Sequence, residues 1–381
     1  MTQDSGISNV EAEIVTEDVL VTGGAGFIGS HTLDYLVQKY PDCKFTCVDK
    51  LSYATNYLEN NLHRVSACNN FIFIKLDLSE EYQRLDELIN HSANNFTTII
   101  NFAAESCVDK SFDDPLYFTK NNVLATQNLL ECCRNLLKSI PNLRRNFKFI
   151  HISTDEVYGE QKEGENIDED GPLHPTNPYA ASKAACDLII EAYKHSYKIP
   201  ITLIRSNNVY GPRQYPEKII PVCLKALEKA SPIGLAEKER IPIHGDGRHT
   251  RRYLHVLDFA KAVDHIWKWL RNTSESSSDF LGETFNVGTN DEVDNLSMVK
   301  LICTIFMRKK FGVESLDASS FIRHTKDRNY NDFRYSIDFT KIKKVGWKQE
   351  ISLEQGIEEL VKAEIENEKC NELLQSKINS A

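Results

Sequence analysis

The sequence lacks any hydrophobic run long enough to cross a membrane. Across 381 residues the hydrophobic fraction is 41% and the charged fraction is 26%, and no apolar stretch approaches the ~20 residues that a bilayer span requires. Clustered basic residues are also scarce, and the net charge is -10. Nucleic-acid surfaces need such clusters to neutralise phosphates. We therefore expect neither a membrane protein nor a nucleic-acid-binding protein.

Metal-ligand and targeting patterns are missing as well. Ten cysteines are present, but no two have C-x-x-C or zinc-ligand spacing, so we expect free thiols and no metal site. The first 18 residues are acidic, without Lys, Arg or an apolar core, unlike secretory and mitochondrial leaders. These features favour a cytoplasmic protein in which residues 1–16 form a flexible acidic arm.

What the sequence does contain is a regular alternation of short β-branched runs and longer amphipathic stretches, from Asp18 to about Ser206. That alternation is typical of a parallel sheet flanked by helices. Strands are predicted at Val19–Thr22, Phe45–Val48, Phe71–Leu76, Thr98–Phe102, Phe147–Ile152 and Ile201–Ile204. The fold class is therefore α/β, with a doubly wound parallel sheet of the Rossmann type.

A second, smaller lobe is predicted after Ser206, where crowded prolines indicate loops and short helices. We assign residues 17–206 to the Rossmann domain, with return segments at about 250–270 and 284–289. Residues 207–249 and 290–365 form the second lobe, and residues 366–381 form a polar helical tail.

A glycine-rich turn follows the first predicted strand. Gly24-x-Gly26-x-x-Gly29 matches the dinucleotide fingerprint, and Gly23-x-x-Gly26-x-x-Gly29 matches its short-chain dehydrogenase variant. Such turns let backbone amides approach a pyrophosphate. Asp49 closes the second strand twenty residues after Gly29, where a carboxylate binds the adenosine ribose and repels an extra phosphate. NAD is favoured over NADP, and the alternative for Asp49 is an ordinary turn residue.

Of four Tyr-x-x-x-Lys matches, only Tyr179 and Lys183 lie just inside a predicted helix start, with Asn177 as N-cap and Pro178 in the first position. Their spacing places both side chains on one helix face. A neighbouring ammonium, together with an oxidised nicotinamide ring, would lower the phenol pKa from about 10. The phenolate could then accept a proton from a substrate alcohol while hydride leaves the same carbon.

Thr154, Asp155 and Glu156 directly follow an apolar strand, and strand carboxyl ends bind ligands in open α/β sheets. Adjacent carboxylates offer an acid and a base for eliminating water, which oxidation or epimerisation alone does not need. The alternative is that the two carboxylates only cap a turn.

Taken together, these motifs resemble the extended short-chain dehydrogenase/reductases, and most closely the nucleotide-sugar 4,6-dehydratases that act on dTDP-glucose or UDP-glucose. The resemblance covers about residues 18–360. It rests on Thr22–Gly29, Val48–Ala54, Ala103–Ser106, Ser153–Gly159, Asn177–Lys183, Ser206–Pro212, Pro216–Lys218, Gly245–Leu254, Asn286–Gly288 and Asp327–Tyr335.

The resemblance implies a lyase that yields a 4-keto-6-deoxy sugar and water with internally recycled NAD. Tyr179 would deprotonate the glucose 4-hydroxyl, and Thr154 would hydrogen-bond it. Glu156 would remove the carbon 5 proton, and Asp155 would protonate the departing 6-hydroxyl. Lys183 would hold the nicotinamide ribose.

The resemblance also implies binding residues. For the cofactor they are Gly23, Gly26, Phe27, Ile28, Gly29, Asp49, Lys50, Ser52, Asp77, Leu78, Ala103, Ala104, Tyr179 and Lys183. For the nucleotide sugar they are Ser106, Thr154, Asn208, Lys218, Arg251, Asn286 and Arg328. A turn role is an equal alternative for Asp77.

Two departures from the family lie near the expected substrate. Cys107 stands where relatives usually have His, and Asn329-Tyr330-Asn331 replaces a bacterial Pro-Gly-His. They leave the nucleotide base, uracil or thymine, open.

A helix predicted at Leu116–Leu137 has an apolar stripe that includes Phe118, Val123, Leu129 and Leu130. In the family this helix and the Tyr179 helix form a homodimer interface; the alternative is that the stripe packs only on the sheet. Two further functions stay open, a 4-epimerase or decarboxylase on the same scaffold and a non-catalytic NAD-sensing protein.

Overall fold

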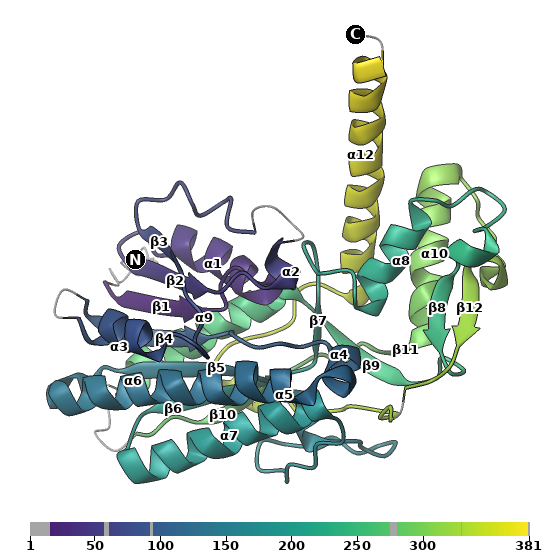
Figure 1. Ribbon diagram of the computed structural model, residues 1–381. Helices are drawn as coiled ribbons and strands as arrows, with labels where there is room; N and C mark the ends of the chain where they lie inside the picture. The colour runs from purple at the N-terminus through teal and green to yellow at the C-terminus, as the bar shows by residue number, and fades with distance from the viewer. Residues whose placement is uncertain (1–15, 57–60, 92–93, 275–279, 329, 380–381) are drawn as a thin grey trace, which may run out of the picture.

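A seven-stranded parallel sheet forms the centre of the molecule (Figure 1). The computed structural model describes residues 16–56, 61–91, 94–274, 280–328 and 330–379. The strand order is β10-β6-β5-β4-β1-β2-β3. The strands are β1 (Asp18–Thr22), β2 (Lys44–Asp49), β3 (Phe71–Lys75), β4 (Phe96–Asn101), β5 (Lys148–Thr154), β6 (Ile201–Ser206) and β10 (Thr284–Val287). The order reverses between β1 and β4, which is where doubly wound sheets open a ligand crevice.

Helices cover both faces of this sheet (Figure 1). On one face α1 (Phe27–Lys39) packs against α9 (Val256–Ser274), with Leu36, Ile266 and Trp267 fully buried between helices and sheet. The other face carries α3 (Tyr82–Asn90), α6 (Ala125–Ser139) and α7 (Pro178–Tyr197), which bury Leu129 and Ile190. These are two separate apolar cores, as expected when helices flank a parallel sheet.

The α/β class and all six predicted strands are confirmed to within two residues at each end. The return at 284–289 is also confirmed, because β10 joins the sheet beside β6. The return at 250–270 is only partly right. Its helix, α9, does pack on the sheet, but its strand β9 (Thr250–His255) pairs with β7 (Asn208–Tyr210) and β11 (Glu292–Asp294) in a separate three-stranded sheet.

The second lobe has its own apolar core, built around Ile241, Met298, Phe306 and Phe321. The expectation of loops and short helices there was wrong in part, because short strands were missed. Besides β7, β9 and β11, the lobe contains β8 (Ile241–His244) paired with β12 (Ile322–Thr325). Its helices are α8 (Ile219–Leu227), α10 (Asn295–Phe311) and α12 (Leu353–Asn379).

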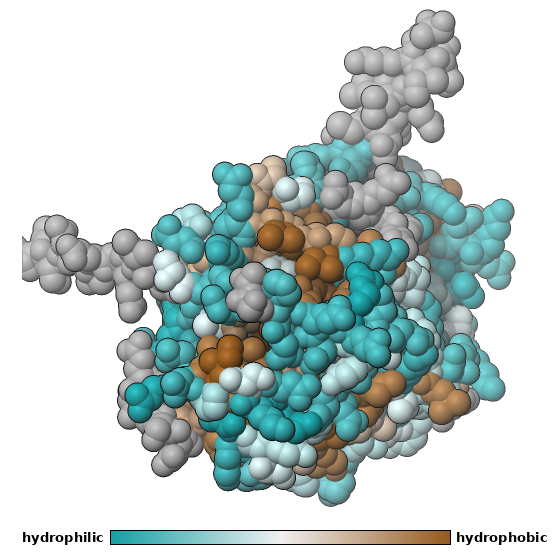
Figure 2. Space-filling view, turned by 60° about the vertical axis from the view of Figure 1, so that its left-hand side comes forward, coloured by the Kyte–Doolittle hydropathy of each residue, from teal (hydrophilic) through white to brown (hydrophobic). Residues whose placement is uncertain are grey.

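The expected polar tail is part of α12, which continues to Asn379 and projects from the body of the molecule (Figure 1). The arm predicted at 1–16 lies almost wholly outside the described residues. Helices long and apolar enough to span a bilayer were sought over the described part of the chain, and none was found. The face turned forward in Figure 2 is mostly hydrophilic, with apolar side chains in small patches.

The helix expected at Leu116–Leu137 is a continuous run of α5 (Pro115–Phe118), a π-helical turn (Thr119–Leu124) and α6. Phe118, Leu129 and Leu130 from the predicted stripe are buried within the fold. Leu129 and Leu130 pack against the sheet, as the alternative predicts, whereas Phe118 packs in a separate cluster with Cys107, Val108 and Tyr179. Other apolar side chains are exposed on the same helices and on α7, namely Leu116, Leu124 and Leu188. Short segments complete the fold: α2 (Tyr53–Asn56), α4 (Val108–Asp113), α11 (Thr340–Lys344) and the 3-10 turns at Pro141–Arg145, Asp155–Tyr158, Glu237–Glu239 and Ala318–Phe321.

Candidate active site

The glycine-rich turn between β1 and α1 leaves no room for side chains. Gly23 has a φ of +68°, and a Cβ built on it would lie 2.5 Å from the Ala103 backbone nitrogen. A Cβ on Gly29 would lie 2.5 Å from the Gly23 carbonyl oxygen. Only glycine permits this turn. It places the α1 N-terminus at the edge of a cavity, as dinucleotide sites require.

That cavity collects the residues predicted for the cofactor. Every one of them lines it: Gly23, Gly26, Phe27, Ile28, Gly29, Asp49, Lys50, Ser52, Asp77, Leu78, Ala103, Ala104, Tyr179 and Lys183. They come from the ends of β1 to β4, from the start of α1 and from α7. The residues present therefore fit an elongated dinucleotide laid across the strand ends.

Asp49 is held at the end of β2 by two backbone N–H groups. Ala25 donates to its Oδ2 at 3.0 Å and Leu51 to its Oδ1 at 2.8 Å. Each oxygen keeps a second lone pair for a ribose hydroxyl. Lys50 is engaged with Glu105, at 3.1 Å. Asp77 lines the cavity predicted for the cofactor. It also accepts from the backbone and side chain of Ser79, as a turn residue does.

Thr154, Asp155 and Glu156 lie where β5 ends in a tight 3-10 turn. Thr154 caps the turn by accepting from the Glu156 N–H at 3.3 Å. Asp155 is only 2% exposed, and burial, with a smaller effect from Glu156, raises its pKa from 3.8 to about 7. Glu156 accepts from the Asn177 amide at 3.2 Å and from the Tyr335 hydroxyl at 3.5 Å. The site thus holds a carboxyl that keeps its proton near neutral pH beside a second carboxylate.

The start of α7 is as predicted. Asn177 is the N-cap, and its side chain accepts from the Ala180 N–H at 2.8 Å. Tyr179 and Lys183 are both buried. Burial raises the pKa of the Tyr179 phenol, and the charge of Glu156 adds to that rise. The lowering expected from Lys183 is therefore not found in the protein without its cofactor. Burial also lowers the pKa of Lys183 itself.

A second cavity adjoins the first and extends towards the smaller lobe. It is lined by six of the seven residues predicted for the substrate: Ser106, Thr154, Asn208, Lys218, Arg251 and Arg328. Tyr179 and Glu156 also line it, so the catalytic groups lie where the two cavities meet.

The cations of this cavity are held by polar contacts. Lys218 Nζ donates to the Ser106 carbonyl at 2.9 Å, and Arg328 pairs with Asp109 at 2.7 Å. The Arg251 guanidinium lies 4.5 Å from the centre of the Tyr335 ring and donates to Asn331 Oδ1 at 3.2 Å. Asn331 belongs to the segment that departs from the bacterial pattern, and it orients a basic group of the cavity. Asn329 lies outside the described residues.

Asn286 does not line the substrate cavity, which corrects the prediction. It is fully buried, and its amide donates to the carbonyls of Ile167 and Asp338 and accepts from the Tyr158 hydroxyl. Its donors and its acceptor oxygen are engaged in joining β10 to neighbouring loops. Asn286 is a structural residue. Asp155 itself is not among the residues that line this cavity, but its neighbours Thr154 and Glu156 are.

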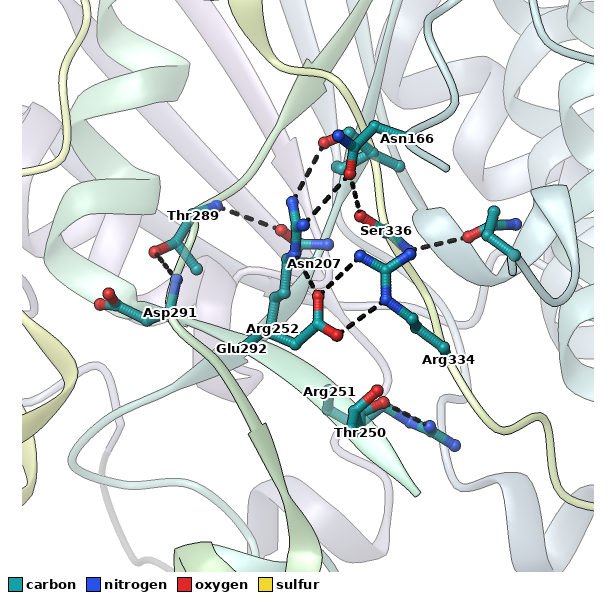
Figure 3. A network of polar contacts seen from close by, with 12 residues as sticks. Asn166, Asn207, Thr250, Arg251, Arg252, Thr289, Asp291, Glu292, Arg334 and Ser336 are labelled. Carbon is teal, nitrogen blue, oxygen red and sulfur yellow. Dashed lines mark hydrogen bonds and ion pairs between the residues drawn. The ribbon is translucent and has the colours of Figure 1, made fainter. Parts of the chain in front are cut away.

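Asn207 is a functional residue that the sequence did not reveal. It donates to Asp155 Oδ2 at 2.7 Å and accepts from the Thr289 N–H at 3.1 Å, the second contact being visible in Figure 3. In the same network Glu292 bridges Arg252 and Arg334, which ties β9 and β11 to the following segment (Figure 3). For Asn207, the only signal in the sequence was its place in the matching motif at 206–212.

Cys107 packs against Val108, Phe118 and Tyr179. It is 5% exposed, and burial raises the pKa of its thiol above 9.0. Cys107 thus belongs to the cluster of buried side chains that includes Tyr179.

Comparisons with known proteins agree with this geometry. A family profile described as GDP-mannose 4,6-dehydratase matches residues 20–360. The dTDP-D-glucose 4,6-dehydratase of Dictyostelium discoideum is 35% identical, over 92% of this chain and 82% of that protein. A trifunctional UDP-glucose 4,6-dehydratase of Arabidopsis thaliana is 37% identical over 90% of this chain, which spans 46% of that longer protein.

Solved structures show the same likeness. A dTDP-glucose 4,6-dehydratase from Bacillus anthracis in complex with NAD superposes with a TM-score of 0.74 and 33% identity, covering 93% of this chain and 98% of that one. A dTDP-glucose 4,6-dehydratase from Streptomyces venezuelae with NAD and TYD bound also has a TM-score of 0.74, with 32% identity over 91% and 96% of the two chains. The UDP-glucose 4-epimerase of Thermotoga maritima follows with 0.70 and 26%, over 91% and 97%.

Proposed function

The chain belongs to the nucleotide-sugar 4,6-dehydratases of the extended short-chain dehydrogenase/reductase family, and from that premise we propose that it is an NAD-dependent lyase acting on UDP-glucose or dTDP-glucose. The products are the 4-keto-6-deoxy sugar nucleotide and water.

One observation carries this proposal. At the end of β5, two adjacent carboxyl groups lie in different surroundings, and burial raises the Asp155 pKa to about 7. Only Glu156 of the two lines the cavity, where it also accepts from Asn177, and acid and base roles are commonly divided between two carboxyl groups in unlike surroundings. Asp155 keeps a proton to give to a leaving hydroxyl, and Glu156 faces the cavity as a base.

The chain's own groups support a complete elimination. Tyr179 accepts the proton of the sugar 4-hydroxyl, which Thr154 orients. Glu156 removes the proton at carbon 5, made acidic by the neighbouring ketone, and Asp155 protonates the 6-hydroxyl as it departs. Glu156 then returns its proton to carbon 5. The residues that line the first cavity would hold NAD, which would supply the hydride acceptor for carbon 4 and the hydride donor for carbon 6, and so would not be consumed.

The fit to a nucleotide sugar rests on the second cavity. Its cations, Lys218, Arg251 and Arg328, suit a diphosphate in a protein with a net charge of -10. The division into a Rossmann domain (17–206) and a substrate lobe (207–249 and 290–365) is part of the same proposal. The central sheet and the second lobe have separate apolar cores, which supports this division. The cytoplasmic location expected from the sequence stays a prediction.

Mass spectrometry of UDP-glucose and dTDP-glucose, each incubated separately with the purified protein and NAD, tests the function. We expect loss of one water from at least one of them, with no net gain in reduced-nicotinamide absorbance. Preferential turnover of one nucleotide settles the base. Asp155→Asn should abolish the mass change, since the leaving hydroxyl loses its proton donor.

A 4-epimerase is the second candidate, because epimerase structures superpose almost as well. It predicts an unchanged mass with glucose-to-galactose conversion, and Asp155→Asn should then leave most of the activity. Epimerisation needs no second carboxyl, so the geometry favours dehydration.

We further infer a homodimer that forms through α5, α6 and α7. Leu116 is 79% exposed and Leu188 is 62% exposed on these helices. Large exposed apolar side chains on neighbouring helices support an interface there, and α5 and α7 contact each other.

A further inference from the structure

Asn207 lies between the ends of three neighbouring strands of the central sheet. It follows β6 directly, and β6 runs between β5 and β10. Its side-chain amide contacts Asp155 after β5 on one side and the Thr289 N–H after β10 on the other. Asn207 is 3% exposed, so both contacts are made away from bulk water. The proposed mechanism uses Asp155 but gives Asn207 no role.

The backbone of Thr289 determines which way the Asn207 amide points (Figure 3). The Thr289 N–H donates to Asn207 Oδ1 at 3.1 Å, and an N–H can only donate. Gly288 leaves room for this contact, because a Cβ built on it would lie 2.3 Å from the same Oδ1. The other end of the amide, Nδ2, therefore faces Asp155 Oδ2, to which it donates at 2.7 Å. A flipped amide would set two N–H groups against each other at Thr289.

The two oxygens of the Asp155 carboxyl differ as a result. Oδ2 accepts from Asn207, while Oδ1 lies 3.3 Å from the Thr154 hydroxyl. In a neutral carboxyl the oxygen without the proton is the stronger acceptor, so the bond from Asn207 favours the proton on Oδ1. We propose that Asn207 is a positioning residue that holds the acid proton of Asp155 on Oδ1, beside Thr154. The inference rests on the proposed function, because elimination is the step that needs this acid.

The same arrangement decides from which side of Asp155 the proton leaves. Asp155 does not itself line the substrate cavity, whereas Asn207 and Thr154 both do. An amide nitrogen only donates hydrogen bonds, but a hydroxyl can both accept and donate. The acid proton therefore reaches the cavity on the Thr154 side.

The protons of the elimination balance with the acid in this position. Glu156 takes the proton of carbon 5, and the electrons of that bond form the double bond to carbon 6. The bond between carbon 6 and its oxygen breaks, and the proton from Asp155 Oδ1 joins that oxygen to give water. Asp155 is left as a carboxylate, while Tyr179 holds the proton gained from the sugar 4-hydroxyl. Once Glu156 has returned its proton to carbon 5, the protons taken from the sugar equal those given to it.

Several groups act on the protonation of Asp155, and Asn207 is prominent among them. Burial has the largest effect and raises the Asp155 pKa, and the hydrogen bond from Asn207 comes next and lowers it. Glu156 raises the pKa further, while Arg251 of β9 and Thr154 lower it, and the result is a pKa of about 7. Removing the Asn207 donor should therefore keep Asp155 protonated to a higher pH.

Infrared spectroscopy of the full-length protein with NAD, below the Asp155 pKa of about 7, tests the inference without turnover. The carboxyl C=O band of Asp155 is assigned by its loss in Asp155→Asn. Asn207→Leu keeps a side chain of similar size but has no donor. We expect this variant to show the Asp155 C=O band at a higher frequency than the wild type, because Oδ2 is the carbonyl oxygen and loses a hydrogen bond. An unchanged frequency in a folded Asn207→Leu protein would place the proton on Oδ2 and overturn the inference.

Asn207→Asp tests the consequence for catalysis. The new carboxyl keeps an oxygen for the Thr289 N–H but has no amide donor for Asp155 Oδ2. Two carboxyl groups in contact share one proton, so the proton moves to the Oδ2 side, away from Thr154. Dehydration should slow by roughly 10²-fold or more. Hydride transfer should continue, so reduced-nicotinamide absorbance should build up during turnover.

A 6-deoxy-6-fluoro analogue of the substrate separates an acid role from a structural one. Fluoride departs without a proton, so Asn207→Asp should release it at close to the wild-type rate. Equal slowing of the analogue and the natural substrate would show that Asn207 only supports the fold, and the inference would be wrong.

Tyr158→Phe is the matched control. Tyr158 ends the same 3-10 turn as Asp155 and is 1% exposed, and its hydroxyl is engaged with Asn286 and Arg205. Any loss of rate in this variant should be the same for the natural substrate and the fluoro analogue. A change in the ratio of the two rates would show that loosening the turn is sufficient, against the inference.

The infrared and turnover results also distinguish the positioning role from the proposed function. A wild type that converts no nucleotide sugar, with the expected band shift in Asn207→Leu, would refute the proposed function and leave the role of Asn207 standing. A wild type that dehydrates its substrate, with an unshifted band in Asn207→Leu, would refute the role of Asn207 alone.

Discussion

Replacing Asp155 by Asn should abolish dehydration and yet stabilise the fold above neutral pH. Asp155 is 2% exposed, and its pKa is about 7 in the folded protein against 3.8 for the ordinary group. Its folded pKa is raised, so the folded state binds the proton more tightly than the unfolded chain does. An ionised Asp155 is therefore a destabilising group in the native state.

The sign and window follow from these two pKa values. Below pH 3.8 the carboxyl is protonated in both states and has no differential effect. As pH rises from 3.8 to 7, the unfolded chain releases its proton while the folded protein retains it, so stability falls. Above pH 7 both states are ionised, and the destabilisation is complete. A difference of about 3 pKa units at 1.36 kcal/mol each gives on the order of 4 kcal/mol. Asn removes this effect and can still accept from Asn207.

Urea unfolding of the wild type and Asp155→Asn, at fixed protein and NAD concentrations between pH 4 and pH 8.5, is the assay. The gain in free energy of unfolding should be near its minimum at pH 4 and should level off above pH 7. Thr202→Val, which removes a buried hydroxyl of β6 that accepts from the Glu283 N–H but is no titrating group, should change stability by the same amount at every pH. A difference between Asp155→Asn and wild type that does not vary with pH would refute the argument, even if activity is lost.

Two further predictions concern packing and assembly. Asp187→Ala removes the carboxylate that lies 2.9 Å from the buried guanidinium of Arg205, so the free energy of unfolding should drop by roughly 3–5 kcal/mol. In urea titrations the double variant Asp187→Ala/Arg205→Met should recover most of this loss. If it does not, the ion pair is not the cause. Leu188→Asp on the exposed face of α7 should shift the mass measured by light scattering from dimer to monomer, whereas Ile233→Asp, on a side chain 90% exposed in the second lobe, should not; a Leu188→Asp dimer would place any interface elsewhere.

The parts of the fold that could be read from sequence are those determined by local pattern. The strands of the central sheet are short runs rich in β-branched and aromatic residues and, apart from the partly exposed edge strand β3, mostly buried, which is a strong strand signal. The start of α7 was equally clear, because Asn177 and Pro178 are N-terminal signals in themselves. Strands β7, β8 and β11 were missed because they are three or four residues long and carry polar or proline residues.

The site divided in the same way. The glycine turn, the end of β5 and the Tyr179 helix are contiguous motifs, and their residues line the expected cavities. Asn207 contacts Thr289, which lies 82 positions away in the chain. His151 contacts Asn101, which lies 50 positions away. Sequence alone contains no register between strands, so it could not predict them. Asn286 shows the converse error, because its motif lies near the site while its side chain points into the protein.

A single physical cause, burial, sets both the acid and the base of this site. It raises the pKa of the Asp155 carboxyl and of the Tyr179 phenol, and it lowers the pKa of the Lys183 amine. Each shift favours the uncharged form of its group, which is what desolvation does. The uncharged carboxyl of Asp155 is the proton donor that the departing hydroxyl needs. Admitting water to the strand ends would lower the pKa of Asp155 and so weaken that role, which gives a physical reason for residues of the second lobe, such as Arg251 and Tyr335, to line the same cavity.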